Sequence, residues 1–459
     1  MIKIILNGKQ VFAEKNTLLS DVLSENGVFV AHPCGRKGVC KKCSVLVNGK
    51  EELACKYKIT SDITVEAIGV EKIKNADEFS GKNALGEFFL ALDIGTTTLA
   101  LALVSKTGER AIRARTAVNS QVSFGADVIS RIEYSKNNSV NELQKVLIND
   151  INALISAINA PYTETLYVVG NTVMLHTLFG EDCSSLGSFP YTPRFLAQKY
   201  VLAESLGIKG VKNIVSLPCV SAFVGADIVS GINCVALPKD NKYNLLIDLG
   251  TNAEVVLFSK TSAIVSAAAA GPCFEGANIS CGMSATAGAI YSYSQGNIKT
   301  VENKKPKGIC GTGLIDIIAE LLKNGIIEEN GYMQEDFFIT EDVYLSCNDI
   351  REYQLAKSAI YSAVLSLMEI ARIDYGKIDT VYLTGGFSAE INIENAIKTG
   401  LLAKELKGKY VALNNASLQG AILYGCSINN FSAFIKYAKY VDLSQNKSFA
   451  KHFLENIEF

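Results

Sequence analysis

FFLALDIGTTTLALALVS, residues 88–105, has the pattern that says most about the fold, and YNLLIDLGTNAEVVLFS, residues 243–259, repeats it. Each stretch holds an apolar run of strand length, then Asp-x-Gly-Thr, then a second apolar run. The pattern predicts a β-hairpin with an aspartate just before a glycine turn. Because the two copies lie far apart in the chain, they favour duplication of a whole α/β domain over a short tandem repeat.

Two further glycine-rich segments belong to the same α/β region. VYLTGGFSAEI (381–391) predicts a strand, a glycine turn and a helix, and GICGTGLIDIIAELL (308–322) predicts a glycine loop that runs into an amphipathic helix. The chain contains no G-x-x-x-x-G-K-[ST], and no G-x-G-x-x-G follows a strand. The sequence therefore offers neither a P-loop nor a dinucleotide fingerprint.

The glycine turns predict a phosphate site. A tight turn with Gly and Thr presents backbone N–H and hydroxyl donors to phosphate oxygens. Asp93 and Asp248, at the base of the two turns, are candidates to hold Mg²⁺ or its waters, or to orient an attacking water. The candidate nucleotide contacts are Gly95, Thr96, Thr97, Gly250, Thr251 and Asn252 at the phosphates, with Gly385 and Gly386 at the nucleoside. The alternative is that these segments are plain hairpins of an α/β core.

Composition limits the functional classes. The chain has 459 residues, 48% of them hydrophobic, enough for two or three domains with large cores. Its net charge of −2 offers no basic surface for nucleic acid or membrane. MIKIILNGK at the start reads as a strand rather than a signal peptide, and no apolar stretch reaches membrane-spanning length. We therefore expect a cytoplasmic protein whose twelve cysteines are mostly thiols.

Four of these cysteines gather near the N-terminus, as Cys34-x5-Cys40-x2-Cys43-x11-Cys55. Three ligands on one glycine-bearing loop and a fourth standing alone is the arrangement of plant-type [2Fe–2S] ferredoxins. Zinc sites usually have two well-separated pairs of ligands, each pair closely spaced, which differs from this arrangement. A zinc site and scattered core cysteines are the alternative interpretations. The sequence predicts a [2Fe–2S] cluster held by these four thiolates, and we interpret His32 as an ordinary loop residue.

The surrounding residues predict a β-grasp fold. We expect two hairpins at NGK turns, a helix over 17–27 between them, and strands at 2–6, 10–13, 44–47 and 51–55. The expected domains are a ferredoxin-like unit over 1–70, a flexible linker over 71–87, two α/β halves over 88–242 and 243–425, and a helical C-terminal extension over 426–459.

The motifs resemble those of the ASKHA superfamily, which includes acetate and sugar kinases, Hsp70 and actin. Asp93 to Thr98 resembles the first phosphate loop, Asp248 to Asn252 the second, and Leu383 to Phe387 the adenosine motif. The whole chain resembles the RACo-type reductive activators of corrinoid proteins. That resemblance rests further on GNTVMLHTLFG (170–180), SAFVGADIVSGI (221–232), GPCFEGANISCGM (271–283) and DIREYQLAKSAI (349–360). The chain departs from the family in its short linker and in Ala253, where the family pattern has glycine.

The resemblance implies a function. An ATP-dependent activator would pass an electron from its [2Fe–2S] cluster to an inactive Co(II) corrinoid protein of a methyltransferase system and restore Co(I). It implies ATP, Mg²⁺, an upstream low-potential electron donor and a homodimer. The loop over 271–283 would meet the corrinoid, with Ser280 as an axial oxygen near cobalt; a packing turn is the alternative reading of this loop.

Several other polar residues receive structural interpretations. Cys273, Cys281 and Cys310 lack a clear fourth ligand and are interpreted as buried thiols. His176 lies in an apolar helix-like run and is interpreted as a hydrogen-bonded core residue. Asp227 and Glu254 lie beside glycine loops, where each either supports a metal ligand or caps a helix.

Two other functions are compatible with the same motifs. A small-molecule kinase regulated by a redox-sensing ferredoxin domain would need a substrate pocket with its own general base. A non-catalytic docking module that uses actin-like closure would tolerate loss of Asp93 or Asp248.

Overall fold

The computed structural model describes residues 1–26, 44–66, 87–106, 110–125, 127–250, 252–276, 278–283, 285–386, 388–429 and 431–459. The cysteine loop over 32–43, most of the expected linker, Thr251 and Phe387 lie outside these residues. The chain forms two compact units, one of Met1–Ala236 with Ala416–Ser432 and one of Leu237–Asn415 with Ala433–Phe459.

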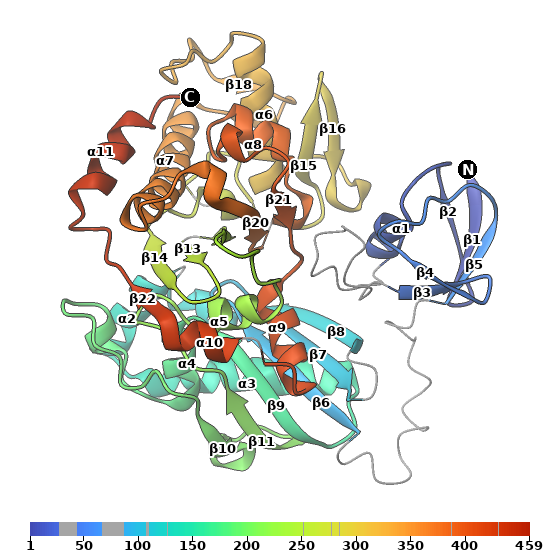
Figure 1. Cartoon of the computed structure of the whole chain (residues 1–459), viewed down its shortest axis with the longest axis vertical. Coiled ribbons are helices and arrows are strands. Elements are labelled where there is room, and N and C mark those ends of the chain that lie inside the picture. The colour runs from blue at the N-terminus through green and yellow to red at the C-terminus, as the bar shows by residue number, and fades with distance from the viewer. Residues whose placement is uncertain are drawn as a thin grey trace. The chain divides into compact units, whose positions relative to one another are not determined.

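The N-terminal residues form a five-stranded sheet with the order β2-β1-β5-β3-β4 (Figure 1). Its elements are β1 (Ile2–Leu6), β2 (Lys9–Ala13), α1 (Leu19–Glu25), β3 (Ser44–Val47), β4 (Lys50–Leu53) and β5 (Ile63–Glu66). Asn7 and Asn48 have φ of 47° and 50°, and a glycine with positive φ follows each. Both NGK hairpins are thus confirmed, because two successive left-handed residues form the turn that matches strand twist.

A six-stranded sheet follows in the first unit, with the order β10-β11-β9-β6-β7-β8. Its strands are β6 (Phe88–Ile94), β7 (Thr98–Ser105), β8 (Arg110–Val118), β9 (Thr163–Gly170), β10 (Tyr200–Leu202) and β11 (Val211–Ser216). The helices of this unit are α2 (Val128–Asn137), α3 (Val140–Ile158), α4 (Thr172–Phe179), α5 (Ala226–Asn233) and α9 (Ala416–Gly425). β6, β9 and β11 are parallel, so their carboxyl ends meet at one edge.

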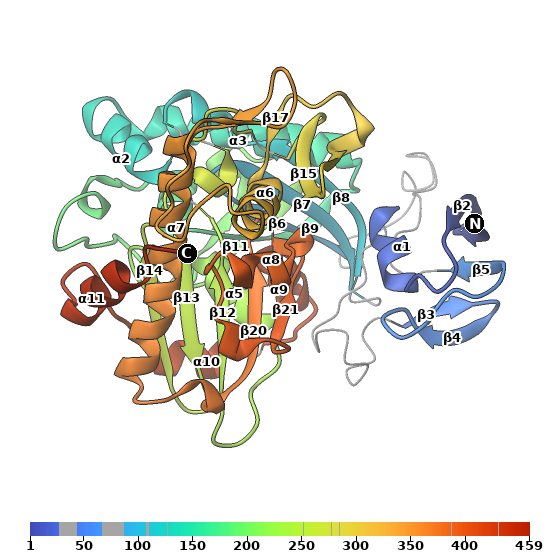
Figure 2. The same cartoon turned by 90° about the horizontal axis from the view of Figure 1, so that it is seen from above.

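The second unit has a six-stranded sheet with the order β21-β20-β12-β13-β14-β22. Figure 2 labels β21, β20, β12, β13 and β14 of this sheet. Its strands are β12 (Tyr243–Asp248), β13 (Ala253–Phe258), β14 (Ala263–Ala268), β20 (Ile378–Thr384), β21 (Tyr410–Ala412) and β22 (Ala438–Tyr440). Its helices are α6 (Gly311–Lys323), α7 (Cys347–Ile370), α8 (Ile393–Lys398) and α11 (Lys447–Glu455). Smaller sheets join β15 (Ala289–Ser294), β16 (Asn297–Thr300) and β17 (Gly308–Ile309), and β18 (Phe337–Phe338) with β19 (Tyr344–Leu345).

The two large sheets share one topology. β6, β7 and β8 form an antiparallel meander, and β9 and then β11 add to β6 in parallel. β12, β13 and β14 repeat the meander, and β20 and then β21 add to β12 in parallel. The two Asp-x-Gly-Thr stretches therefore occupy the same hairpin of the same mixed α/β pattern.

One of the two helices expected after glycine-rich segments forms, and the other does not. GICGTGLIDIIAELL contains α6, whose buried side includes Leu314, Ile315 and Ile318, as the amphipathic pattern predicts. The helix expected after the glycine pair near 385 is replaced by a short 3-10 turn at Ser388–Glu390. The C-terminal segment holds α10 (Phe431–Tyr437) and α11, and α11 packs along α7. No helix in the described ranges combines the length and apolarity that crossing a bilayer would need.

Candidate functional site

The first Asp-x-Gly-Thr turn closes the hairpin between β6 and β7. Asp93 lies near the end of β6, and Gly95 N donates to Thr98 O (3.0 Å) across the turn. A Cβ on Gly95 would lie 2.6 Å from that same Thr98 O. The turn therefore needs glycine here because any side chain would collide with backbone.

Two asparagines and an arginine hold this turn from one side. Asn119 Nδ2 donates to Gly95 O (3.0 Å), and Asn119 N donates to Thr97 O (2.9 Å). Arg131 Nη2 donates to Thr96 O (2.7 Å), and Asn171 Nδ2 donates to Thr96 Oγ1 (3.1 Å). In a trans peptide the C=O and the following N–H point in opposite directions. The hydrogen-bonded carbonyls of Gly95, Thr96 and Thr97 therefore direct the amides that follow them to the opposite side of the turn. A row of amides on one side of a turn is the arrangement that binds anions.

Two neighbouring strand ends complete this edge of the first unit. Asn171 follows β9 and caps α4, accepting from Met174 N (3.0 Å). Gly225 lies so close that a Cβ would be 2.4 Å from Asn171 Cα. Asp227, in the first turn of α5, is thereby brought to the same edge, and burial raises the pKa of its carboxyl to about 6. The Asp227 carboxylate accepts a hydrogen bond from the backbone N–H of the next residue, Ile228 (2.8 Å).

The second turn is built differently. Asp248 ends β12, and Leu249 N donates to Thr384 O (2.8 Å) at the end of β20. Gly385 has φ of +109°, and a Cβ there would lie 2.7 Å from Asp248 Oδ1 and 2.4 Å from Leu249 O. Gly386, by contrast, has no atom within 4 Å of an added Cβ. The fold thus brings Asp248 and Gly385, two of the predicted site residues, into direct contact.

Other carboxylates surround the second turn. Glu254 is the direct cross-strand neighbour of Asp248, and Glu275 Oε1 lies 3.8 Å from where a Gly250 Cβ would stand. Across the ranges that the structure describes, His, Cys, Asp and Glu nowhere form a group of three suited to a metal ion. The residues therefore fit Mg²⁺ only in its usual nucleotide-bound form, with one or two carboxylates and the remaining ligands from phosphate and water.

Ser280 is exposed and tied to the start of α7. Ser280 N donates to Asp349 Oδ1 (2.8 Å), and its hydroxyl lies 3.1 Å from the same oxygen and 2.9 Å from Ser346 Oγ. Asp349 is fully buried and also accepts from Ser346 N (2.8 Å), as part of the capping box of α7. The Ser280 hydroxyl is therefore oriented by a buried carboxylate while its oxygen remains at the surface.

The predicted cluster ligands are only partly within the described residues. Cys34, Cys40 and Cys43 lie outside them, and β3 starts directly after Cys43. Cys55 is 3% exposed and belongs to the core of the N-terminal sheet, with Leu19 and Val45. Its burial fits a thiolate that faces a cluster, since such ligands are shielded from water.

The remaining cysteines fit the structural interpretation with one exception. Cys273 and Cys310 are buried, and burial raises the pKa of the Cys273 thiol to about 12. The prediction that Cys281 is buried is wrong, because it lies in a turn and is partly exposed. Its thiol accepts a hydrogen bond from Tyr344 N (3.5 Å).

His176 is confirmed as a core histidine. It is fully buried, accepts from Arg194 N at Nε2 (3.0 Å), and stacks on Phe195. Because Nε2 accepts, Nδ1 carries the proton and donates to Thr172 O (2.7 Å). Burial lowers its pKa, so it stays neutral.

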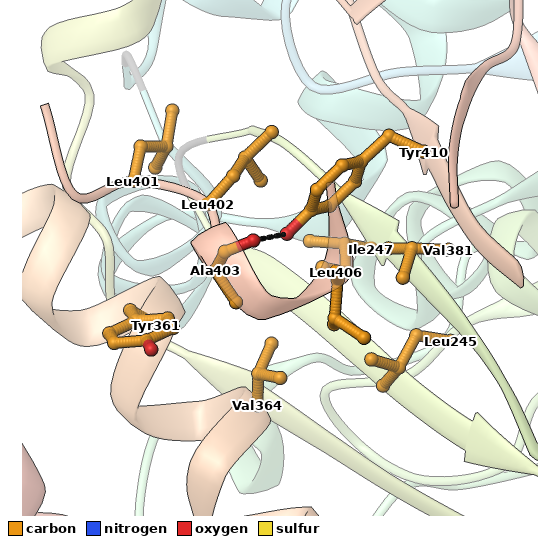
Figure 3. A pocket seen from close by; sticks show the side chains of 10 residues that line it. All are labelled: Leu245, Ile247, Tyr361, Val364, Val381, Leu401, Leu402, Ala403, Leu406 and Tyr410. Carbon is orange, nitrogen blue, oxygen red and sulfur yellow. Dashed lines mark hydrogen bonds between the residues drawn. The ribbon is translucent and has the colours of Figure 1, made fainter. Parts of the chain in front are cut away.

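A small cavity in the second unit does not compete with the turns as a phosphate site. Figure 3 shows its lining, where aliphatic side chains of β12, β20 and α7 meet Leu401, Leu402 and Leu406. Of its two tyrosines, Tyr410 donates to Ala403 O (2.8 Å), and the Tyr361 hydroxyl is hydrogen-bonded to the Tyr375 hydroxyl (2.8 Å). A pocket of this composition lacks donors for phosphate oxygens.

The residues that support the first turn were not predicted from the sequence. Asn171 carries a local signal, because a strand-Gly-Asn-helix pattern is a recognisable cap signal. Asn119 and Arg131 carry no local signal, because they reach the turn from segments that follow it by more than twenty residues.

Comparisons with known proteins assign the family. Residues 88–240 match the family model "RACo middle region", and residues 242–459 match "C-terminal domain of RACo the ASKHA domain". The second match runs through the segment expected to be a C-terminal extension.

Similar proteins cover from 72% to 100% of the chain. The corrinoid activation enzyme RamQ of Eubacterium limosum is 24% identical, over 98% of this chain and 98% of its own. The [Co(II) methylated amine-specific corrinoid protein] reductase of Methanosarcina barkeri is 24% identical, over 72% and 68%. The solved structure of a reductive activator for corrinoid,iron-sulfur protein aligns with a TM-score of 0.74 and 26% identity, over 100% and 98%. The chain, with its ASKHA domain, belongs to the RACo family of reductive activators of corrinoid proteins.

Proposed function

We propose that this chain is an enzyme that reactivates a corrinoid protein by ATP-dependent one-electron reduction. The single observation that carries the proposal is the family match over 88–240 and 242–459, together with full-length similarity to a reductive activator. The four N-terminal cysteines would hold a [2Fe–2S] cluster, which when bound would supply the one electron that converts Co(II) of the partner to Co(I). An upstream low-potential donor would replace that electron. The partner is the corrinoid protein of a methyltransferase system.

The proposed nucleotide contacts are the two Asp-x-Gly-Thr turns and the glycine pair. In the first unit, the amides after Gly95, Thr96 and Thr97 meet phosphate oxygens. In the second unit, Gly250, Thr251 and Asn252 do the same, and Gly385 and Gly386 approach the nucleoside. Asp93 and Asp248 hold the waters of a nucleotide-bound Mg²⁺ or orient the attacking water. The inward-tied carbonyls of the first turn and the close fit of Asp248 on Gly385 support these roles.

The proposed cluster site uses Cys34, Cys40, Cys43 and Cys55 in a β-grasp domain over 1–70, joined by the linker over 71–87. The burial of Cys55 and the five-stranded sheet support this domain. When bound, the cluster supplies the one-electron couple. The shared topology of the two large sheets supports duplication of the halves over 88–242 and 243–425, with 426–459 as a terminal segment.

The proposed partner contact is the exposed hydroxyl of Ser280. Its oxygen would serve as an axial ligand to cobalt, because Ser280 is exposed and its hydroxyl is held in place by Asp349. A homodimer is the proposed assembly.

The experiment reduces the anaerobically purified chain and mixes it with a Co(II) corrinoid protein, following the Co(I) absorption with and without Mg-ATP. We expect Co(I) only with ATP, and its loss in Cys43→Ala and Asp248→Ala. Matched controls are Cys347→Ala and Asp240→Ala, which change exposed residues outside the proposed sites and should retain full activity. An intact cluster and normal ATP binding without Co(I) from any corrinoid partner would refute corrinoid reduction. Phosphorylation of a small metabolite would instead support the kinase.

A further inference from the structure

Asn171 contacts two elements of the first unit with one side chain. It follows β9 directly and is the N-cap of α4. Its Oδ1 accepts from Met174 N (3.0 Å), and its Nδ2 donates to Thr96 Oγ1 (3.1 Å) in the first Asp-x-Gly-Thr turn. A single amide group therefore joins the start of a helix to a hydroxyl of the candidate phosphate site.

Close backbone contacts bring Asn171 to this turn. Gly170 is the parallel partner of Ile94 at the end of β6, and a Cβ on Gly170 would lie 2.6 Å from Ile94 O. A Cβ on Gly225 would likewise lie 2.4 Å from Asn171 Cα. The backbone at Asn171 is thus fixed by two contacts that need glycine, which keeps its side chain beside Thr96.

The contact with Met174 fixes which end of the Asn171 amide faces Thr96. A backbone N–H can only donate, so the atom that meets Met174 N is the amide oxygen. The amide nitrogen therefore faces Thr96, and because this nitrogen carries only donors, the Thr96 hydroxyl oxygen accepts. A hydroxyl that accepts from Asn171 directs its own proton away from Asn171.

Capping of α4 does not by itself explain the amide nitrogen. A cap needs one oxygen that accepts from the backbone of the first turn, and serine, aspartate and asparagine are about equally good at this. Of these three, only asparagine places an N–H donor beside the capping oxygen. The bond from Nδ2 to Thr96 is therefore a feature beyond the helix cap.

We propose that Asn171 is a positioning residue that makes the Thr96 hydroxyl a hydrogen-bond donor to a phosphate oxygen of the nucleotide. An ionised phosphate oxygen has lone pairs and no proton, so it matches a donor at this position and is mismatched with an acceptor. Asn171 acts on the nucleotide through Thr96 alone. The proposal rests on ATP binding by the first turn, as in the proposed function.

The test is a double-mutant cycle on the full chain, in which calorimetry measures the dissociation constants of Mg-ATP and of adenosine. Asn171→Ser keeps an oxygen to cap α4 but removes the nitrogen donor. Thr96→Val keeps the shape of the side chain but removes the hydroxyl. We expect Thr96→Val to weaken Mg-ATP binding by about 10-fold or more, as for a lost hydrogen bond to a charged group. Asn171→Ser should weaken it by about 3- to 10-fold.

The cycle decides whether Asn171 acts through the hydroxyl. In the Thr96→Val background, Asn171→Ser should have no further effect on Mg-ATP affinity, because the group that it orients is gone. An equal cost of Asn171→Ser in the two backgrounds would overturn the proposal. Adenosine has no phosphate, so its affinity should stay unchanged, and a loss equal to that of Mg-ATP would also overturn the proposal.

Asn171→Asp covers the case in which Asn171→Ser does not fold, and it reverses the polarity of the contact. The carboxylate still caps α4, but both of its oxygens accept, so the Thr96 proton turns toward it. We expect a larger loss of Mg-ATP affinity than in Asn171→Ser. Charge repulsion accounts for the part that persists in the Thr96→Val background, and the remainder should vanish there. A loss of the same size in both backgrounds would contradict the proposal.

Asn446→Ser is the matched control, because it makes the same exchange at the cap of α11. Asn446 Oδ1 accepts from Ser448 N (2.8 Å) and Phe449 N (3.1 Å). This variant should bind Mg-ATP like the wild type, and a loss equal to that of Asn171→Ser would overturn the proposal. A wild-type chain that binds no Mg-ATP would overturn the proposed nucleotide function as well. Normal wild-type binding with an additive cycle would overturn the role of Asn171 alone.

Discussion

The two Asp-x-Gly-Thr turns share a motif and a place in the sheet, yet they are supported in different ways. The first is held by polar side chains: Asn119, Arg131 and Asn171 bind its carbonyls and one hydroxyl. The second is held by backbone: Leu249 N bonds to Thr384 O, and the Asp248 carboxylate packs on Gly385. The same local sequence therefore depends on buried side-chain hydrogen bonds in one unit and on the absence of a side chain in the other.

The two turns are therefore sensitive to different substitutions. A side-chain support can be removed by substituting a residue far along the chain, and the loss is a few unsatisfied hydrogen bonds. A glycine support fails when any Cβ is added, because backbone and carboxylate then have to move.

Gly385→Ala should have the largest effect. The new Cβ would meet Leu249 O at 2.4 Å and Asp248 Oδ1 at 2.7 Å in a backbone with φ of +109°. We expect a loss of about 3 kcal/mol or more in unfolding free energy. Denaturant unfolding measures the stability and an ATPase assay the activity, and we expect ATP hydrolysis to be lost because Asp248 is displaced.

Gly386→Ala is the matched control for that change. Its Cβ would meet nothing within 4 Å, so stability should stay within about 0.5 kcal/mol of the wild type. Equal losses in the two variants would show that the contact with Asp248 does not distinguish the two glycines.

Replacing the corresponding glycine by alanine should destabilise the first turn but leave the stability of the second nearly unchanged. A Cβ at Gly95 would lie 2.6 Å from Thr98 O, whereas at Gly250 the nearest atom, Asn252 O, lies at 3.4 Å. We expect Gly95→Ala to cost about 1–3 kcal/mol and Gly250→Ala to be near neutral in urea unfolding. The reverse order would mean that the first turn relaxes more easily than its hydrogen bonds suggest.

Asn171→Ala tests the side-chain support alone. It removes the cap of α4 and the bond to Thr96 Oγ1, so we expect a loss of about 1–2 kcal/mol and weaker Mg-ATP binding. Ser139→Ala is the control, because it also removes a helix cap. Ser139 Oγ accepts from Asn141 N at the start of α3 and has no hydrogen bond to the turn. It should lower the unfolding temperature but leave the Mg-ATP dissociation constant unchanged, as measured by calorimetry.

Asp227→Asn should have the smallest effect, and only on pH dependence. The folded-state pKa of about 6 lies above the ordinary 3.8, so the native state binds the extra proton between these values. Wild-type stability therefore rises as pH falls through 6 and is lower above it. Between pH 7 and pH 5 the wild type should gain about 1 kcal/mol relative to Asp227→Asn. Thermal unfolding of both chains at the two pH values measures this difference, and identical pH profiles would contradict the raised pKa.

Much of the fold could be predicted from local patterns. Alternation of apolar runs with glycine turns predicted both Asp-x-Gly-Thr hairpins, and the Asn-Gly pairs predicted both N-terminal turns. The helix expected after Gly386 was wrong, because the chain makes only a 3-10 turn at Ser388–Glu390 before α8. Such short turns carry no periodicity that sequence reasoning can detect.

The family and the candidate motifs could be read from consecutive residues. Asp93, Asp248 and the four N-terminal cysteines are predicted as site residues from spacing and residue type. The supports of the turns, such as Arg131 beneath Thr96 and Gly385 against Asp248, became visible only in the folded chain. These contacts join residues 35 and 137 positions apart, and a contact made through space leaves no periodic trace along the chain.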